Sequence, residues 1–212
     1  MAIKNIIFDW DGTLGMTLHL WLAGYQSGMD NQGHEFSETV LARDFFYEHD
    51  KGAKKYPHVD FTRLVSDAYN HLEQNLPNLK LYEGAAKTLG HLQSRGLNLA
   101  LVTSSPRAIA RRGMGVHNLE QYFRSLIGGD DGFGHKPHPA PFDETIQRLN
   151  ASPEETLIIG DARTDILAGQ AARTTTCLFT PESNKLFHDF EELGAIGADY
   201  TIDRLADLVD LI

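Results

Sequence analysis

Short, mostly continuous apolar runs that alternate with helical patterns are the feature that most constrains this chain. Six such runs occur, at residues 6–8, 97–103, 124–129, 156–161, 174–179 and 198–202. Because most of them do not alternate apolar with polar residues, they are typical of strands covered on both faces. Segments with helical spacing separate them. This order predicts an α/β fold, a Rossmann-like parallel sheet flanked by helices.

Local signals mark the ends of some of these helices. One helical pattern ends at Gly96, a residue type favoured just after a helix C-terminus. Ser105 followed by Pro106 predicts an N-cap and a first helical residue. Ser152 and Glu155 fit a capping box at the start of another element.

Residues 15–80 interrupt the alternation. They contain no run of the buried-strand type, and 37–49 and 61–76 are their clearest helical stretches. The sequence "KGAKKYP" at 51–57 predicts a turn. We expect the aromatic residues of this segment to form its own apolar core, namely Phe45, Phe46, Tyr47 and Tyr69.

Size and composition suit one globular core with a small insert. The chain has 212 residues, of which 42% are hydrophobic and 23% are charged. We predict a Rossmann-like core domain from residues 1–14 and 81–212 and a helical cap domain from residues 15–80. The single cysteine, Cys177, excludes an intramolecular disulfide framework and lies in an apolar run, where a buried core residue is expected.

The formal net charge of −10 argues against general nucleic-acid binding, because phosphate backbones attract basic surfaces. It leaves room for a small anionic substrate in a local pocket. No apolar stretch approaches the roughly 20 residues of a membrane span, and no signal peptide is visible. A cytoplasmic enzyme or binding protein, with no membrane partner and existing as a monomer or homodimer, is therefore expected.

Polar side chains follow four of the predicted strands, where each strand ends. They are Asp9, Asp11, Thr103, Ser104, Lys136, Asp161 and Asp165. Because ligands bind at the carboxyl ends of strands in an open parallel sheet, we expect these residues to meet. Carboxylates held close together repel one another, and a bound cation relieves that repulsion. Oxygen ligands without a His/Cys cluster favour Mg²⁺ over Zn²⁺.

A phosphate ester fits this set of groups. Mg²⁺ commonly bridges to phosphate, and the hydroxyls and free amides of Thr103 and Ser104, which open a helix, favour an anion. A carboxylate can attack phosphorus and form an aspartyl-phosphate. A second carboxyl can protonate the leaving oxygen and later activate water. Asp9 and Asp11 would share one side of an extended backbone and could divide these two tasks.

Four ordered segments resemble the motifs of the haloacid dehalogenase superfamily. They are "DWDGTL" (9–14), Thr103, Lys136-Pro137 and "GDARTD" (160–165). The resemblance covers nearly the whole chain, and residues 15–80 resemble the helical cap of phosphoglycolate-phosphatase-like and β-phosphoglucomutase-like members. It implies a Mg²⁺-dependent phosphatase that acts on a small phosphorylated metabolite beneath a closing cap.

The resemblance also implies roles in the chemistry. Asp9 would be the nucleophile, and Asp11 the general acid and base. Thr103 would hydrogen-bond the transferring phosphoryl group, with Ser104 beside it. Lys136 would neutralise charge on Asp9 and on the phosphate.

The same resemblance implies the metal ligands. Asp9 would bind Mg²⁺ through its carboxylate and Asp11 through its main-chain carbonyl. Asp161 would bind Mg²⁺ directly, and Asp165 would bind it or orient the groups around it. Asp9-x-Asp11-Gly12 also resembles part of a calcium loop, but a third ligand before the glycine and a distal glutamate are missing.

Asp11 bears on the branch of the superfamily. Dehalogenases of the superfamily typically lack an acid here, and phosphonoacetaldehyde hydrolases, which are similar at Trp10, usually carry a small residue. Asp11 therefore favours phosphate esters. The chain departs from the common pattern in "GMT" at 15–17, where Thr17 stands after the motif, and in Arg173, where the helix after the fourth motif usually ends in glycine.

Alternatives stay open at this point. A phosphomutase of the β-phosphoglucomutase type shares the motifs, and a phosphonate hydrolase or a catalytically silent binding domain are less favoured. In "GGDDG" (128–132), Asp130 could line the rim of the site, although a polar loop is expected. His135 and His138 flank Lys136-Pro137 and could bind anions, although solvated positions are expected for both.

Overall fold

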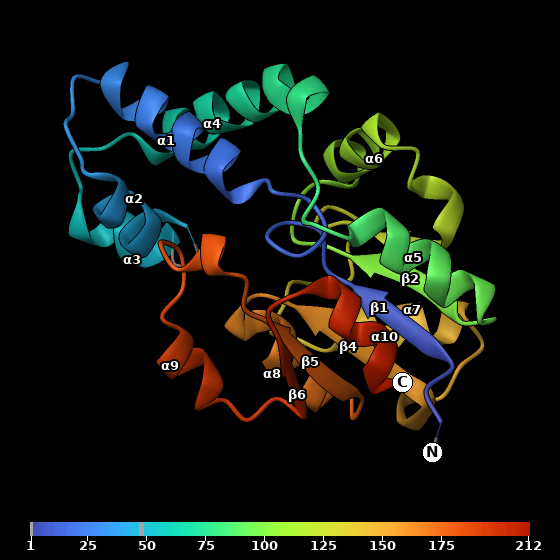
Figure 1. Ribbon diagram of the computed structural model, residues 1–212. Helices are drawn as coiled ribbons and strands as arrows, with labels where there is room; N and C mark the ends of the chain where they lie inside the picture. Colours follow the sequence, from blue (N-terminus) through green and yellow to red (C-terminus); the bar gives the residue numbers. More distant parts are fainter. Residues whose placement is uncertain (1, 47–48) are drawn as a thin grey trace.

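The computed structural model describes residues 2–46 and 49–212. Its centre is a six-stranded parallel sheet with the strand order β3-β2-β1-β4-β5-β6 (Figure 1). The strands are β1 (Asn5–Phe8), β2 (Asn98–Val102), β3 (Phe123–Ile127), β4 (Thr156–Gly160), β5 (Thr175–Phe179) and β6 (Tyr200–Ile202). Each predicted apolar run overlaps one strand, and the α/β prediction is confirmed.

Helices cover both faces of the sheet. They are α5 (Ala85–Ser94), α6 (Arg107–Val116), α7 (Ala140–Arg148), α8 (Arg163–Ala171), α9 (Phe190–Gly194) and α10 (Leu208–Leu211). One apolar cluster joins Ile6 and Phe8 of β1 to α5, α6 and α10. A second cluster joins Ile7 to α7 and α8. Burial on both faces explains why the strands are continuous apolar runs in the sequence.

Two of the predicted helix starts were wrong. Pro106 is the N-cap of α6, which begins one residue later than expected, and its first amide is bound by the Asp130 carboxylate at 2.7 Å. Ser152 precedes only a 3₁₀ turn, and its side chain makes no capping bond, because the chain passes directly from that turn into β4. Gly96 does follow α5, with a φ of +84°.

The segment between β1 and α5 is helical. It holds α1 (Leu18–Asp30), α2 (Glu38–Phe45), α3 (His49–Lys55) and α4 (Phe61–Asn75). Helices α1 and α4 lie side by side (Figure 1), and a Cβ on Gly24 would lie 2.8 Å from the Ala68 Cα. A glycine at this position therefore lets the two helices approach closely. None of the described helices is both long and apolar enough to cross a membrane.

Helix α3 replaces most of the turn predicted at 51–57. Its last turn is tied to α2, because Lys55 and Tyr56 both bind the Asp44 carboxylate at 2.7 Å. Gly52 also packs against the Asp44 carbonyl, which leaves no room for a side chain. Contacts with α2 thus stabilise a helix that local sequence does not favour.

The aromatic residues of the segment divide between two clusters. Phe45 is fully buried in a cluster formed by α1, α2 and α4, and Phe46 packs against it. Tyr47 lies outside the described residues. The prediction was wrong for Tyr69, which packs against the main core cluster and beside Trp21, with ring centroids 4.8 Å apart. The last part of α4 enters that core through Leu72, and Tyr69 is one turn away.

Candidate active site

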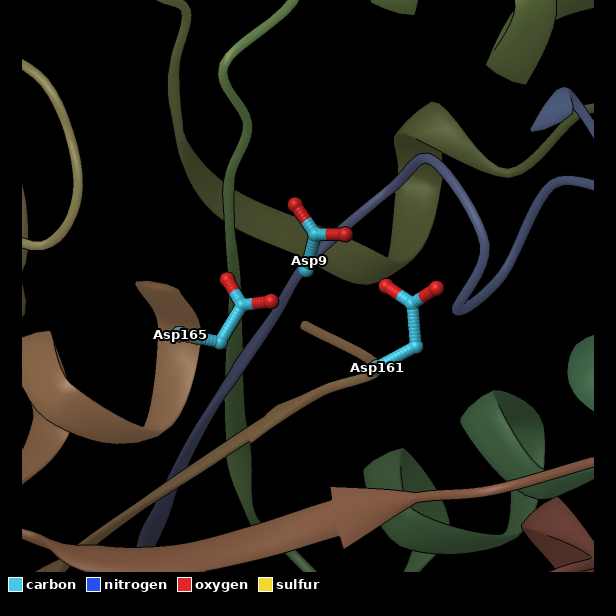
Figure 2. A group of neighbouring side chains, drawn as sticks. All are labelled: Asp9, Asp161 and Asp165. Carbon is cyan, nitrogen blue, oxygen red and sulfur yellow. The ribbon is translucent and has the colours of Figure 1, made fainter. Parts of the chain in front are cut away.

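The carboxyl ends of the parallel strands bring the predicted acidic residues together. Asp9 follows β1, Asp161 follows β4, and Asp165 lies in the first turn of α8. Figure 2 shows their carboxyl groups on the same side of the strand ends. One oxygen from each lies within 4.8 Å of the others, and all three side chains are buried.

Lys136 lies within this cluster. Its Nζ is 2.6 Å from Asp9 Oδ1 and also donates to Asp165 Oδ1, and its side chain is 4% exposed. Burial alone would lower the pKa of Lys136, but the charges of Asp165 and Asp9 outweigh burial and hold the pKa above its ordinary value. The lysine therefore keeps its charge. The second oxygen of Asp165 accepts from the Ala162 amide at 3.1 Å.

The positive charge of Lys136 does not balance the three acids. Burial raises the pKa of Asp9 well above its ordinary value, and Asp165, Asp161 and Asp11 raise it further, while Lys136 opposes them. Burial likewise raises the pKa of Asp161, with His188 acting in the opposite direction. A buried, all-oxygen set of acids with excess negative charge fits a hard divalent cation such as Mg²⁺.

The turn after β1 is shaped by the site. Gly12 has a φ of +80°, and a Cβ there would lie 2.0 Å from Asp161 Oδ2. The Thr13 hydroxyl lies 3.3 Å from Asp9 Oδ2 and 3.4 Å from Asp161 Oδ1. Trp10 is buried in the core, on the opposite side from its two acidic neighbours. Its side chain packs in the core, so the one residue that is similar to the phosphonate-cleaving branch lies outside the acidic cluster.

Asp11 is partly exposed and accepts three hydrogen bonds. Thr17 Oγ1 donates at 2.6 Å and Trp21 Nε1 at 3.1 Å to Oδ1, and Thr103 Oγ1 donates at 3.1 Å to Oδ2. The Thr103 hydroxyl in turn accepts from the Ser105 amide at 3.0 Å. Ser104 is exposed beside it. Thr103 is therefore at the site, with its hydroxyl on Asp11.

Comparison with known proteins identifies the family. Residues 6–179 match the haloacid dehalogenase-like hydrolases. This chain belongs to that family. The pyrophosphatase PpaX of Anoxybacillus flavithermus is 31% identical over 222 residues, which cover 100% of this chain and 98% of the relative. Its relatives place the hydrolase among the phosphatases of the family, as the motifs predicted.

Solved structures share the fold of this hydrolase. A protein from Haemophilus somnus named "predicted phosphoglycolate phosphatase" superposes with a TM-score of 0.85 at 23% identity, covering 99% of this chain and 97% of the other. A HAD family hydrolase from Deinococcus radiodurans, with bound phosphate and sodium, gives a TM-score of 0.81 at 23% identity, covering 97% and 93%. At these identities the likeness establishes the fold alone.

Trp21, Asn184 and His188 contact the acids of the site and were not identified from the sequence, whereas Thr17 was noted there only as the residue that stands after the first motif. Thr17 and Trp21, one helical turn apart at the start of α1, hold Asp11. Asn184 and His188, after β5, hold Asp161 at 3.0 and 2.9 Å. Asn184 and His188 follow the end of a predicted strand, and that position was the sequence signal that could have pointed to them. Strand β5 lies beside β4 in the sheet, so residues after β5 can reach Asp161.

The remaining polar candidates lie in loops, and three of them accept hydrogen bonds from nearby backbone amides. Asp130 binds the first amide of α6, and Asp131 binds the Gly128 amide at 2.9 Å. His138 Nδ1 accepts from the Ala140 amide at 3.1 Å, and His135 is exposed. In the described part of the chain, no hydrogen bond or ion pair joins either histidine to the acidic cluster.

Proposed function

We propose that this hydrolase is a Mg²⁺-dependent phosphatase that cleaves a small phosphorylated substrate through an aspartyl-phosphate on Asp9. The observation that carries the proposal is the buried Asp9 carboxylate, held at 2.6 Å by the Lys136 ammonium. Oxygens of Asp161 and Asp165 lie within 4.8 Å of it. This arrangement combines a nucleophile, a fixed positive charge and oxygen ligands at the end of a parallel sheet.

The residues that would hold Mg²⁺ are Asp9, Asp161 and the main-chain carbonyl of Asp11, with Asp165 beside them. Mg²⁺ bound there would offset the excess negative charge and polarise a phosphoryl oxygen. Asp165 already binds Lys136 and the Ala162 amide, so orienting these groups would be its main contribution.

The proposed reaction has two steps. An Asp9 oxygen attacks phosphorus, the bond from phosphorus to the leaving oxygen breaks, and Asp11 gives that oxygen a proton. Asp11 then takes a proton from water, the water oxygen attacks phosphorus, and the bond from Asp9 to phosphorus breaks. Inorganic phosphate leaves, and both carboxyl groups return to their starting state. Lys136 neutralises the charge of the free Asp9 carboxylate before the first step and again after the second.

The relatives suggest the first substrate to test. The PpaX relative is named a pyrophosphatase, and it matches this chain along its whole length. Pyrophosphate is therefore the leading candidate, followed by small phosphate esters such as phosphoglycolate. We also propose that the helices of residues 15–80 act as a cap, since Thr17 and Trp21 already reach Asp11 from that segment. Closure would exclude bulk water from the phosphoryl group.

Phosphate release over a panel of pyrophosphate, phosphoglycolate, sugar phosphates and nucleotides tests the proposal, with Mg²⁺ and with a chelator. Mg²⁺-dependent release is expected from wild type and from Asp203→Asn, which changes an exposed acid. Asp9→Asn is expected to abolish release. Normal turnover by Asp9→Asn would refute the nucleophile, and isomerised sugar phosphate without free phosphate would indicate a phosphomutase. No reaction across the panel would support a catalytically silent domain.

A further inference from the structure

The turn that follows β5 carries a fully buried asparagine at its centre. Asn184 ends the 3₁₀ turn Glu182–Asn184 and is 1% exposed. Its Nδ2 donates to the Gly12 carbonyl at 2.9 Å and to Asp161 Oδ2 at 3.0 Å. Its Oδ1 accepts from the Tyr82 hydroxyl. Each polar atom of this side chain is thus used, and two of its contacts fix the turn after β1 relative to Asp161.

His188 reaches the same oxygen of Asp161. Its Nε2 is 2.9 Å from Oδ2, and its side chain is 5% exposed. Two neighbours on Oδ2 fix the orientation of the carboxylate, and Oδ1 lies 3.4 Å from the Thr13 hydroxyl, which is also 3.3 Å from Asp9 Oδ2. Partners that orient a ligand in this way set the affinity of a metal site.

The side chain between these two residues points elsewhere. Phe187 is 7% exposed and belongs to the apolar cluster of α1, α2 and α4. Its ring centroid is 5.0 Å from that of His19 and 4.9 Å from that of Phe46. Figure 1 shows this part of the chain near α2, whose C-cap residue is Phe46. Residues 184–188, the junction turn, therefore contact both Asp161 and the helices of residues 15–80.

We propose that Asn184 and His188 are positioning residues for Asp161, and that Phe187 makes the metal affinity of the site depend on how those helices pack. The inference rests on the proposed function, because it takes Asp161 as a metal ligand. Since the junction turn is short, a shift of Phe187 with its apolar cluster moves the donors on either side of it. Packing of the helical segment and binding of the metal then favour each other.

Binding of Mn²⁺ alone, followed by electron paramagnetic resonance, tests the positioning role without any turnover. His188→Phe keeps a ring of similar size but has no donor, and we expect it to weaken Mn²⁺ binding by about tenfold or more. His188→Gln can still donate and should stay within about threefold of wild type. His91→Ala, an exposed histidine of α5, should bind as wild type does. Equal Mn²⁺ binding by His188→Phe and wild type would overturn the positioning role.

The coupling is tested with Phe187→Ala, which touches no acid of the site. We expect it to weaken Mn²⁺ binding by at least about threefold. The matched control is Phe61→Ala, which removes an aromatic ring of the same cluster; in the described part of the chain its ring contact is a stack on Phe45 and not on Phe187. The coupling would be contradicted if both variants weakened Mn²⁺ binding equally, or if neither variant weakened it. Because binding is read directly, an inactive wild type would refute the proposed function and leave this test intact.

Discussion

Asp11 and Asp161 are both charged neighbours of Asp9, and the chain holds them in different ways. Asp11 is partly exposed and accepts bonds from Thr17 and Trp21, at the start of α1. Asp161 is 1% exposed and is held by residues near the C-terminus. A carboxylate that must exchange protons with a substrate needs access, whereas a metal ligand needs a fixed orientation. The two environments match the two roles proposed for these acids.

Replacing Asp11 or Asp161 by asparagine tests whether the two acids have different roles, and we expect the largest effects from these two variants. Asp161→Asn should lose measurable Mg²⁺ binding and reduce turnover by about 10³-fold or more, since metal-ion catalysis contributes several kcal/mol. Asp11→Asn should reduce turnover by about 10²–10⁴-fold, the range of general acid–base catalysis, with near-normal Mg²⁺ binding. Calorimetric titration with Mg²⁺ and phosphate release measure both. Equal loss of Mg²⁺ binding in the two variants would show that the acids do not differ in role.

Lys136 connects Asp9 to Asp165, and its removal should affect stability. Lys136→Met leaves two buried carboxylates without their partner, which costs about 3–5 kcal/mol of unfolding free energy. Mg²⁺ should restore part of this loss, because it binds the folded state. Urea unfolding with and without Mg²⁺ measures both effects. Lys185→Met, at an exposed pair with Glu182, should change stability by under about 0.5 kcal/mol. If Lys136→Met matched it, the buried pair would not be stabilising.

The donors of Asp11 can be tested separately from those of Asp161. Trp21→Phe keeps the ring against Tyr69 and removes the indole N–H from Asp11. We expect kcat to fall about tenfold, the effect of about 1.4 kcal/mol from one hydrogen bond to a charged group, with Mg²⁺ affinity unchanged. His188→Phe should show the opposite pattern. Its metal affinity should be weaker, while its turnover at saturating metal concentration should stay close to that of wild type. If Trp21→Phe also weakened metal binding, the two acids would not be independently held.

The sheet and the acids at its edge could be predicted because they obey local rules. Continuous apolar runs mark buried parallel strands, and Asp9, Asp161 and Lys136 follow such runs where ligands gather. Trp10 was left without a predicted position, although the alternation of side chains along a strand already implied that it points away from Asp9 and Asp11.

The partners of the acids could not be predicted, because they depend on how distant segments return to the sheet. Helix α1, which carries Trp21, contains Gly24 and Gly28, and glycine lowers intrinsic helix propensity. These two glycines are explained by tertiary packing, because both lie where α1 approaches α4 closely. Asn184 and His188 stand among ordinary polar loop residues. Only the adjacency of β5 and β4 brings them to Asp161.

The smallest expected effects concern the C-terminal ends of two helices, α7 and α8. Helix α8 is the one that carries Asp165. Arg173 follows α8 with a φ of +60°, and Asn150 follows α7 with a φ of +51°. Both close the same type of turn, with Thr174 bound to the Gly169 carbonyl and Ala151 to the Ile146 carbonyl.

Left-handed backbone costs a residue with a Cβ about 1 kcal/mol, and asparagine tolerates it better than arginine does. Arg173→Gly should therefore raise the unfolding free energy by about 0.5–1 kcal/mol, and Asn150→Gly by less. Urea unfolding of both variants measures the difference, and turnover should not change, because Arg173 is an exposed residue at the far end of α8 from Asp165. A larger gain from Asn150→Gly would show that side-chain contacts, and not backbone conformation, decide stability at these helix ends.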